Sequence, residues 1–239
     1  MSYRLRDLDN PLIKQGMTAQ LETRRTRMAA GEKPLGWKVG MGAPASMQML
    51  GLSAPLVGYL MQKALLPSGA TVSLAGYKRP VAEPEICVRM GKDLAGGATA
   101  EAALAAIKEI TPAIEIADLD PAPAPDNLDL VLGRNIFQRH VVLADKARPG
   151  GSVAGLTSRL IRRGAEVAST GDPEALTGTL IDIVAHVANV VAAFGEKLSA
   201  GDVIITGSIT PPIMIEPDET AIAHAIDPIG VVSASFAWE

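Results

Sequence analysis

The sequence predicts an α+β fold dominated by curved, mixed β-sheet, with an N-terminal helical segment and one long late helix. Three observations lead to this prediction: a helical pattern near the N-terminus, many short strand-like segments, and one long apolar stripe at helical spacing late in the chain. The length of 239 residues suits one large domain. Only 3% of residues are aromatic, so the core is expected to be aliphatic.

The first helix is expected over residues 10–30. Asn10 is a good side-chain cap and Pro11 suits the first helical position. A short helix over residues 45–52 and a short strand over residues 71–74 follow.

A strand over residues 79–90 organises the predicted site. At strand period, Glu83 and Glu85 share one face, opposite an apolar face. A second strand, residues 112–118, presents Glu115 between two alanines, while the direction of Asp118 stays open. Neighbouring carboxylates raise one another's pKa unless a positive group separates them, and a divalent cation with oxygen ligands is the natural partner. A solvated strand face is the alternative interpretation of each carboxylate alone.

Lys38 lies between two glycines in the segment Gly36-Trp-Lys-Val-Gly40. Glycine allows a ligand to approach the backbone closely. A lysine placed there suits a carboxylate or a developing enolate, although a surface lysine with a buried stem fits the same pattern.

The later elements alternate helix and strand. A helix over residues 100–109 is capped by Thr99, and residues 135–144 continue the sheet. The long late helix is expected to begin at Asp172 and to run to residue 198. Asp182 and His186 within it are read as an exposed structural pair.

The last part of the chain is expected to be strand. A buried strand from residue 203 ends in a hydroxyl-bearing turn with Ser208 and Thr210, a kind of turn that binds anions. A plain loop is the alternative. Residues 228–238 alternate as a half-buried final strand.

Composition excludes several classes of function. The formal net charge is −4 without a basic block, which argues against nucleic-acid binding and against binding to anionic membranes. Cys87 is alone, so an intrachain disulfide and a cysteine-rich zinc site are excluded, and a cytoplasmic location is expected. No signal-peptide or membrane-spanning apolar run is visible.

Several motifs occur in one order and together resemble the 2-keto-4-pentenoate hydratase / 4-oxalocrotonate decarboxylase family of the fumarylacetoacetate hydrolase superfamily. The resemblance runs from about residue 12 to residue 236. The motifs are Gly36-Trp-Lys-Val-Gly40, Met47-Gln48 with Leu50-Gly51, Glu83-Pro-Glu85, Gly91-Lys-Asp-Leu94, Pro112-Ala-Ile-Glu-Ile-Ala-Asp118, Leu198-x-x-Gly201-Asp202 and Thr206-Gly-Ser208-x-Thr210.

The resemblance implies a mixed sheet rolled into a barrel-like β-sandwich and a homo-oligomer. It implies one domain over residues 1–239, with a smaller N-terminal α/β part (1–70) and a β-rich catalytic core (71–239). The implied function is a metal-dependent lyase that hydrates a 2-hydroxydienoate or decarboxylates a 2-oxo diacid through a metal-stabilised enolate. Alternatives are a hydrolase that cleaves the C–C bond of an acylpyruvate, and a non-catalytic 2-oxo-acid-binding protein.

The resemblance also assigns roles to residues. Mg²⁺ or Mn²⁺ is bound by Glu83, Glu85 and Glu115. Lys38 contacts the 2-oxo acid, with the hydroxyl of Ser208 or Thr210 nearby. The catalytic candidates are Lys38, Ser208 and His140, and the substrate-binding candidates are Val39, Gly40, Asn135, Gln138, Gly207 and Thr210.

Two departures from the family pattern affect the expected chemistry. Gln62-Lys63 stands where the family carries acidic residues, so a general acid/base is missing from its usual place. His140, near the expected pocket wall, is a candidate replacement. After Asn135, where the family has small hydroxyl residues, this chain has Ile-Phe-Gln (136–138).

Overall fold

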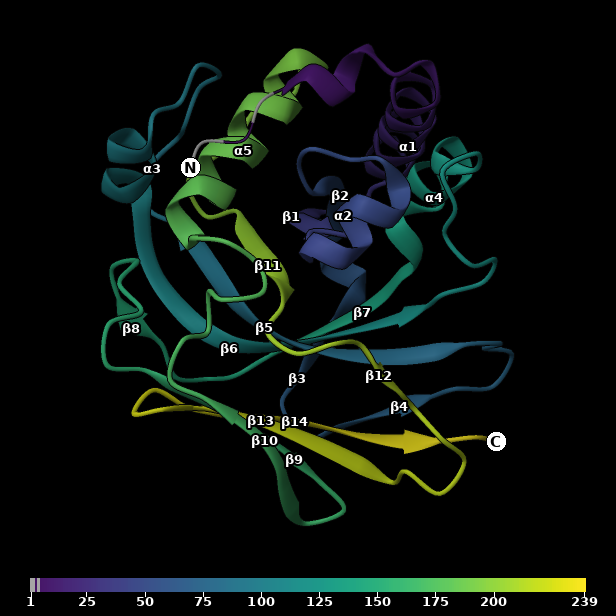
Figure 1. The fold of residues 1–239 in the computed structure, drawn as a ribbon, viewed down its shortest axis with the longest axis vertical. Coiled ribbons are helices and arrows are strands. Elements are labelled where there is room, and N and C mark those ends of the chain that lie inside the picture. The colour runs from purple at the N-terminus through teal and green to yellow at the C-terminus, as the bar shows by residue number, and fades with distance from the viewer. Residues whose placement is uncertain (1–2, 4) are drawn as a thin grey trace.

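The computed structural model describes residue 3 and residues 5–239, which form two β-sheets and a set of helices (Figure 1). Within the described residues, the larger sheet has nine strands and the smaller has five. The larger sheet contains β1 (Pro34–Gly40), β2 (Leu56–Met61), β3 (Leu65–Pro67), β5 (Pro80–Met90), β6 (Ile107–Asp118), β7 (Gln138–Leu143), β8 (Arg148–Pro149), β11 (Val203–Ser208) and β12 (Ile213–Met214). The smaller contains β4 (Ala70–Ser73), β9 (Thr157–Arg162), β10 (Ala165–Thr170), β13 (Ala221–Asp227) and β14 (Gly230–Ala237).

The larger sheet is rolled. Its strand order is β2-β1-β11-β5-β6-β7-β3, so β2 and β3 are the two ends of the path. Only the short 3-10 helix η2 (Gln62–Ala64) separates these two strands in the chain. The two ends of the path must therefore lie close together, and the sheet curls into a barrel-like wall. The strands of the expected N-terminal part (residues 1–70), β1 to β3, belong to the same sheet as β5, β6, β7 and β11 of the expected catalytic core (residues 71–239).

The inner face of the rolled sheet carries a small apolar cluster and the charged residues described below. The apolar members include Leu60, Cys87, Ala113, Val141 and Ile205. The opposite face packs outward, as the side-chain period of two requires.

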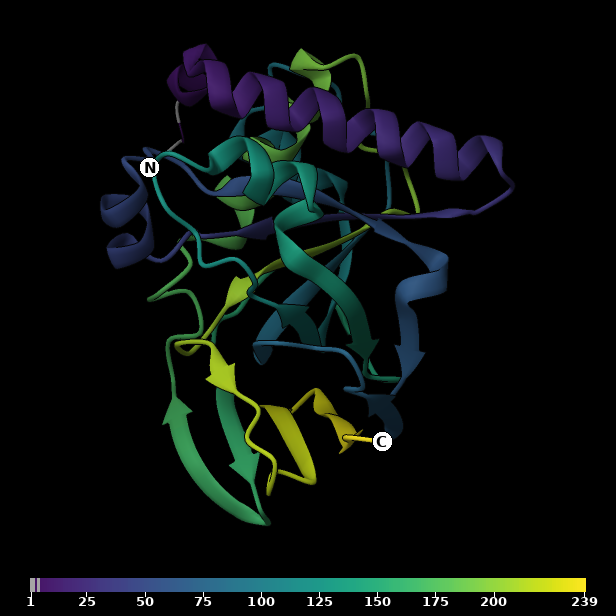
Figure 2. The same ribbon diagram turned by 90° about the vertical axis from the view of Figure 1, so that its right-hand side faces the viewer.

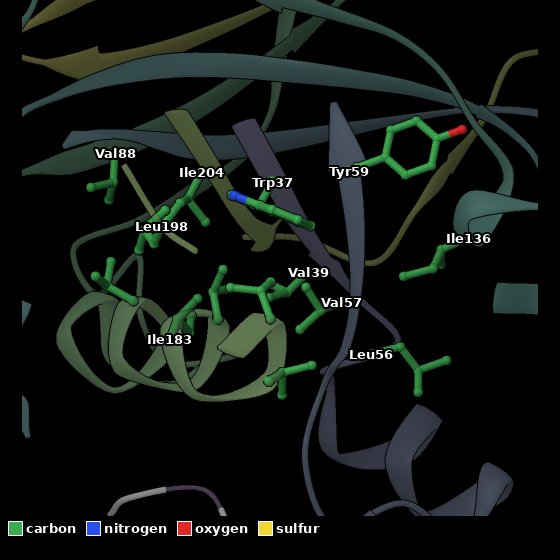
Figure 3. Packing of buried hydrophobic residues seen from close by; sticks show 14 of the residues in the cluster. Trp37, Val39, Leu56, Val57, Tyr59, Val88, Ile136, Ile183, Leu198 and Ile204 are labelled. Carbon is green, nitrogen blue, oxygen red and sulfur yellow. The ribbon is translucent and has the colours of Figure 1, made fainter. Parts of the chain in front are cut away.

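The outward face meets helices on one side and the second sheet on the other (Figures 1 and 2). Trp37, Val39 and Ile204 pack toward α5 (Leu180–Ala193) in the main core (Figure 3). Ile114 and Ile116 of β6 instead pack against the second sheet. The rolled sheet therefore separates the core under the helices from the core against the second sheet, and the same sheet encloses the barrel interior.

Local signals place the early helices as predicted. α1 (Pro11–Ala29) begins after Asn10, whose side chain accepts the N–H of Leu12 at 2.9 Å. α2 (Pro44–Leu50) ends at Gly51, which has φ of 69°. The remaining short helices are η1 (Leu5–Asp9), α3 (Ala100–Ala106), α4 (Leu128–Gly133) and η3 (Asn135–Phe137). No helix within the described residues is long and apolar enough to cross a membrane.

The predicted start of the late helix at Asp172 is wrong. Gly178 has φ of 83° and interrupts the helical backbone, and residues 173–177 form turns. The helix begins after Thr179, whose hydroxyl accepts the N–H of Asp182 at 3.2 Å. His186 is not an exposed partner of Asp182, because it is 4% exposed and its Nε2 lies 2.8 Å from the carbonyl oxygen of Pro55.

The cap of α5 gives a direct test of this start. Thr179→Ala removes the hydroxyl that satisfies a free helix N–H, so we expect the free energy of unfolding to fall by about 1 kcal/mol. Asp172→Ala removes an exposed turn contact and is expected to cost at most about 0.5 kcal/mol. Urea unfolding of both variants measures the difference, and an equal loss in both would restore Asp172 as the cap.

Candidate metal centre and active site

Three glutamates meet inside the rolled sheet. Glu83 and Glu85 come from β5, and Glu115 comes from β6, directly opposite Glu83 in the antiparallel register. One carboxylate oxygen of each lies within 4.8 Å of the others. Alternation along β5 and direct pairing with β6 therefore bring together the three residues that the sequence predicts as metal ligands.

Lys38 reaches the same cluster from β1. The register joins Lys38 to Ile205 of β11 and Ile205 to Cys87 of β5, so the lysine shares the inner face with the glutamates. Its side chain is buried, and Nζ donates to Oε1 of Glu115 in a close ion pair. The carbonyl oxygen of Ile136 lies 3.5 Å from the same Nζ.

Gly207 completes the cluster through its backbone. The register between β11 and β5 shifts between Ile205 and Ser208, and Gly207 has φ of 94° in that irregularity. Its N–H donates to Oε2 of Glu85 at 2.6 Å. Ser208 pairs with Glu85, and within the described residues its buried Oγ has no hydrogen-bond partner.

Burial raises the pKa of all three carboxylates, and repulsion from neighbouring carboxylates adds to this at Glu83 and Glu85. Burial, followed by repulsion from Glu115, raises the pKa of Glu83 to about 7. The same two causes raise the pKa of Glu85 well above its usual value. Burial also raises the pKa of Glu115, against the attraction of Lys38. Ionised carboxylates here require further positive charge.

A divalent cation fits this donor set. Three ionised carboxylates and one ammonium group carry a net charge of −2, which a divalent cation cancels. Hard oxygen donors suit Mg²⁺ or Mn²⁺. Oε2 of Glu115 is buried without a hydrogen-bond partner among the described residues, so a donor atom is available.

A cleft adjoins the site at the end of the barrel where β1 and β11 finish. It is lined by residues 175–179, by the start of α2 and by the residues just before it. Thr177 belongs to this lining and contacts Gly207, since a Cβ on Gly207 would lie 3.3 Å from Thr177 Cγ2. The cleft therefore lies beside the backbone that binds Glu85.

Among the other predicted site residues, Gln138 shares the inner face. It pairs with Ala117, two residues beyond Glu115, and its buried Nε2 has no hydrogen-bond partner within the described chain. His140 pairs with Ile116 instead, and Ile116 packs outward against the second sheet. A register irregularity between these two pairs turns His140 away, so the structure does not bring it to the carboxylates.

Four further predicted residues have structural contacts. Val39 packs in the main core, and Gly40 lies against Ile136, whose Cγ2 would be 2.8 Å from a Cβ there. Both amide atoms of Asn135 bind the backbone of β2. Thr210 donates to the carbonyl of Pro211 at 3.1 Å.

Two open questions from the sequence receive answers in the geometry. Asp118 accepts the N–H groups of Lys78 and Arg79 at 3.1 and 2.8 Å, so it fixes the turn before β5. Gln62 and Lys63 are exposed at the far end of β2, four and five residues beyond Gly58, which pairs with Lys38. At about 3.3 Å per residue, they lie more than 10 Å along the chain from the level of Lys38.

The sequence interpretation missed Gly58 and the turn at residues 135–137. Asn135, Ile136 and Phe137 have φ of 55°, 50° and 62°, a left-handed conformation that costs a non-glycine residue about 1–3 kcal/mol. Burial of Ile136 and Phe137 in the main core offsets that cost. A glycine inside an apolar run is a signal of close approach, and Gly58 in the run Leu56–Met61 was the available clue.

The comparisons with known proteins show the family of this chain. A sequence profile described as "Fumarylacetoacetate (FAA) hydrolase C-terminal" matches residues 38–236. The chain is 31% identical to a 4-oxalocrotonate decarboxylase of Pseudomonas sp, over 89% of this chain and 82% of that protein. It is 32% identical to a 2-hydroxyhexa-2,4-dienoate hydratase of Comamonas testosteroni, over 83% of this chain and 77% of that protein.

A solved structure matches nearly the whole chain. The 4-oxalocrotonate decarboxylase from Pseudomonas putida G7, complexed with magnesium and adipate, superposes with a TM-score of 0.84 at 26% identity, covering 99% of this chain and 90% of that one. This chain belongs to the fumarylacetoacetate hydrolase family. The predicted fold class and family resemblance are confirmed.

The raised pKa of Glu83 predicts a pH-dependent stability in the metal-free protein. The folded state holds this proton up to about pH 7 and the unfolded state to about pH 4.5, so the free energy of unfolding contributed by Glu83 falls as the pH rises between these values. We expect wild type to lose on the order of 1–3 kcal/mol relative to Glu83→Gln between pH 5 and 8.

Urea unfolding in chelator, at each pH, measures this difference. His224, whose pKa burial lowers to about 4, acts in the opposite direction over an overlapping range but equally in both proteins. Adding Mg²⁺ should restore wild-type stability at pH 8, because the ion binds the ionised carboxylates. A pH dependence identical in the two proteins would contradict the assignment.

Proposed function

We propose that this protein is a divalent-metal-dependent lyase acting on a small 2-oxo acid. The reaction is hydration of a 2-hydroxydienoate or decarboxylation of a 2-oxo diacid, the activities named for its relatives. The observation that carries the proposal is the cluster of three carboxylates, two buried and one half-buried, beside one ammonium group on the inner face of the rolled sheet.

Glu83, Glu85 and Glu115 hold Mg²⁺ or Mn²⁺ in this proposal. When bound, the ion supplies a Lewis acid that polarises the keto oxygen of a 2-oxo acid. The N–H of Gly207 orients the carboxylate of Glu85, and the Lys38 ammonium does the same for Glu115.

The Lys38 ammonium lies inside a wall that carries apolar residues. Its charge, in that low-dielectric setting, stabilises negative charge that develops on the keto oxygen. Ser208 Oγ and Gln138 Nε2 are buried donors without a partner in the described chain, and we propose that they bind polar atoms of the substrate.

Catalysis is favoured over a binding-only role because the relatives of this chain are named as a decarboxylase and a hydratase. Gln62 and Lys63, whose change motivated the binding-only alternative, are exposed at the far end of β2. We further propose a homo-oligomeric, cytoplasmic enzyme. The lone Cys87 is buried and reduced, which suits a reducing compartment.

Metal-dependent turnover tests the proposed function. Protein stripped with chelator and then supplied with Mg²⁺ or Mn²⁺ is expected to consume 2-hydroxypenta-2,4-dienoate or 4-oxalocrotonate. The loss of substrate is measured by its ultraviolet absorbance. Glu83→Gln should abolish both metal binding and turnover. Full activity of Glu83→Gln would reject the proposal, and pyruvate release from acylpyruvates alone would replace it with C–C hydrolysis.

Substitution of Ser208 and of His140 tests which face of the sheet binds the reacting end of the substrate. Ser208→Ala removes a buried donor beside Glu85 and is expected to lower kcat/KM by about 10- to 100-fold, because a substrate polar atom left unpaired there costs about 1–3 kcal/mol. His140→Ala changes a side chain on the outward face and should stay within about twofold of wild type. A larger loss of activity in His140→Ala than in Ser208→Ala would indicate that the reacting end of the substrate binds on the His140 side.

A further inference from the structure

The side chain of Asn135 binds the edge of β2 through both of its amide atoms. Oδ1 accepts the N–H of Tyr59 at 2.8 Å, and Nδ2 donates to the carbonyl of Tyr59 at 2.8 Å. β2 is one end of the strand path, so among the described residues no neighbouring strand pairs with this side of its backbone. The amide of Asn135 therefore ties η3 to the wall of the barrel, and Tyr59 and Ile136 lie on the same side of β2 (Figure 3).

Asn135 and Lys38 share the space over Gly58. A Cβ on Gly58 would lie 2.9 Å from Oδ1 of Asn135 and 3.0 Å from Cγ of Lys38. Gly58 also pairs with Lys38 in the strand register. The missing side chain is therefore filled jointly by the amide of Asn135 and the aliphatic stem of Lys38.

The turn after Asn135 directs a carbonyl group toward the ammonium of Lys38. The carbonyl oxygen of Ile136 lies 3.5 Å from Nζ, and it is held there by three consecutive left-handed residues. Such a backbone persists only when its surroundings hold it. The paired hydrogen bonds of Asn135 fix the first of the three residues.

We propose that Asn135 is a positioning residue for Lys38. Its amide fixes the 135–137 turn on β2 and shares the space over Gly58 with the stem of Lys38, so the ammonium stays beside Glu115 and faces the oxygens of a bound 2-oxo acid. This role differs from the substrate contact that the family resemblance implies for Asn135. The inference rests on the proposed function, because it assigns the purpose of Lys38 to the binding of such an acid.

Oxalate binding to the Mn²⁺-loaded protein tests the inference without requiring turnover. Oxalate presents two adjacent oxygen-bearing groups, as the enolate form of a 2-oxo acid does. By titration calorimetry at saturating Mn²⁺, we expect Asn135→Ala to weaken oxalate binding roughly tenfold and Lys38→Met to weaken it at least as much. The double variant should bind no more weakly than Lys38→Met, because Asn135 acts through Lys38.

Asn127→Ala is the matched control. The Asn127 amide also binds backbone at both atoms, at 2.8 Å from the N–H of Ala124 and 3.0 Å to the carbonyl of Ala122, but in a loop away from Lys38. It should bind oxalate as wild type does. Unchanged affinity of Asn135→Ala, or losses that add in the double variant, would overturn the inference.

Gly58→Ala provides a second route if Asn135→Ala does not fold. Its Cβ displaces the same two side chains, so it should weaken oxalate binding in the wild-type background and have no further effect with Lys38→Met. A loss in both backgrounds would reject the positioning role. A wild-type protein that binds Mn²⁺ but no oxalate contradicts the proposed function itself, and the inference then fails with it.

Discussion

Three carboxylates and one ammonium group buried inside a rolled sheet are the constraint on which the rest of the structure depends. Burial of like charges is unfavourable, and here the Lys38 ammonium and one backbone N–H oppose it only in part. The strand framework holds the three carboxylates together against the repulsion that remains. Each carboxylate is carried by a central strand with a neighbour on both sides, so the groups have little freedom to separate.

The apolar packing outside the barrel supports that rigidity. Trp37 and Val39 on either side of Lys38 are buried toward α5, while Ile114 and Ile116 on either side of Glu115 are buried toward the second sheet. A charged residue on the inner face is thus flanked in sequence by apolar residues anchored in two different cores. Because side chains alternate along a strand, burial of these apolar residues outside the barrel fixes the positions of the charged residues on its inner face.

Much of this was predictable from sequence, where the signal is local. Asn10 with Pro11 marks a helix start by hydrogen-bonding chemistry alone, and Glu83 with Glu85 shares a face by strand period. The meeting of Glu115 and Lys38 with that pair came from the family resemblance, because no local pattern determines which strands are neighbours.

What the sequence did not predict depends on irregular backbone. The side of the sheet that His140 occupies is set by one register irregularity in β7, and the start of α5 is set by the left-handed Gly178. The strands β9 and β10 were missed because most of their residues are polar, and only Ser158 and Leu160 of β9 are fully buried, so the apolar alternation in the sequence is weak. Irregular positions have no period, and only the assembled fold reveals them.

The position of β11 has a consequence for biosynthesis. This strand lies between β1 and β5 in the sheet, although about 160 residues separate it from β1 in the chain. Until it inserts, Lys38 has no neighbour on the side of the glutamates, and Glu85 lacks the N–H of Gly207. Contacts of such long sequence separation form late in folding. A nascent chain on the ribosome therefore carries the acidic ligands long before it carries a finished centre, and competence to bind a metal tightly arrives only once β11 has been synthesised.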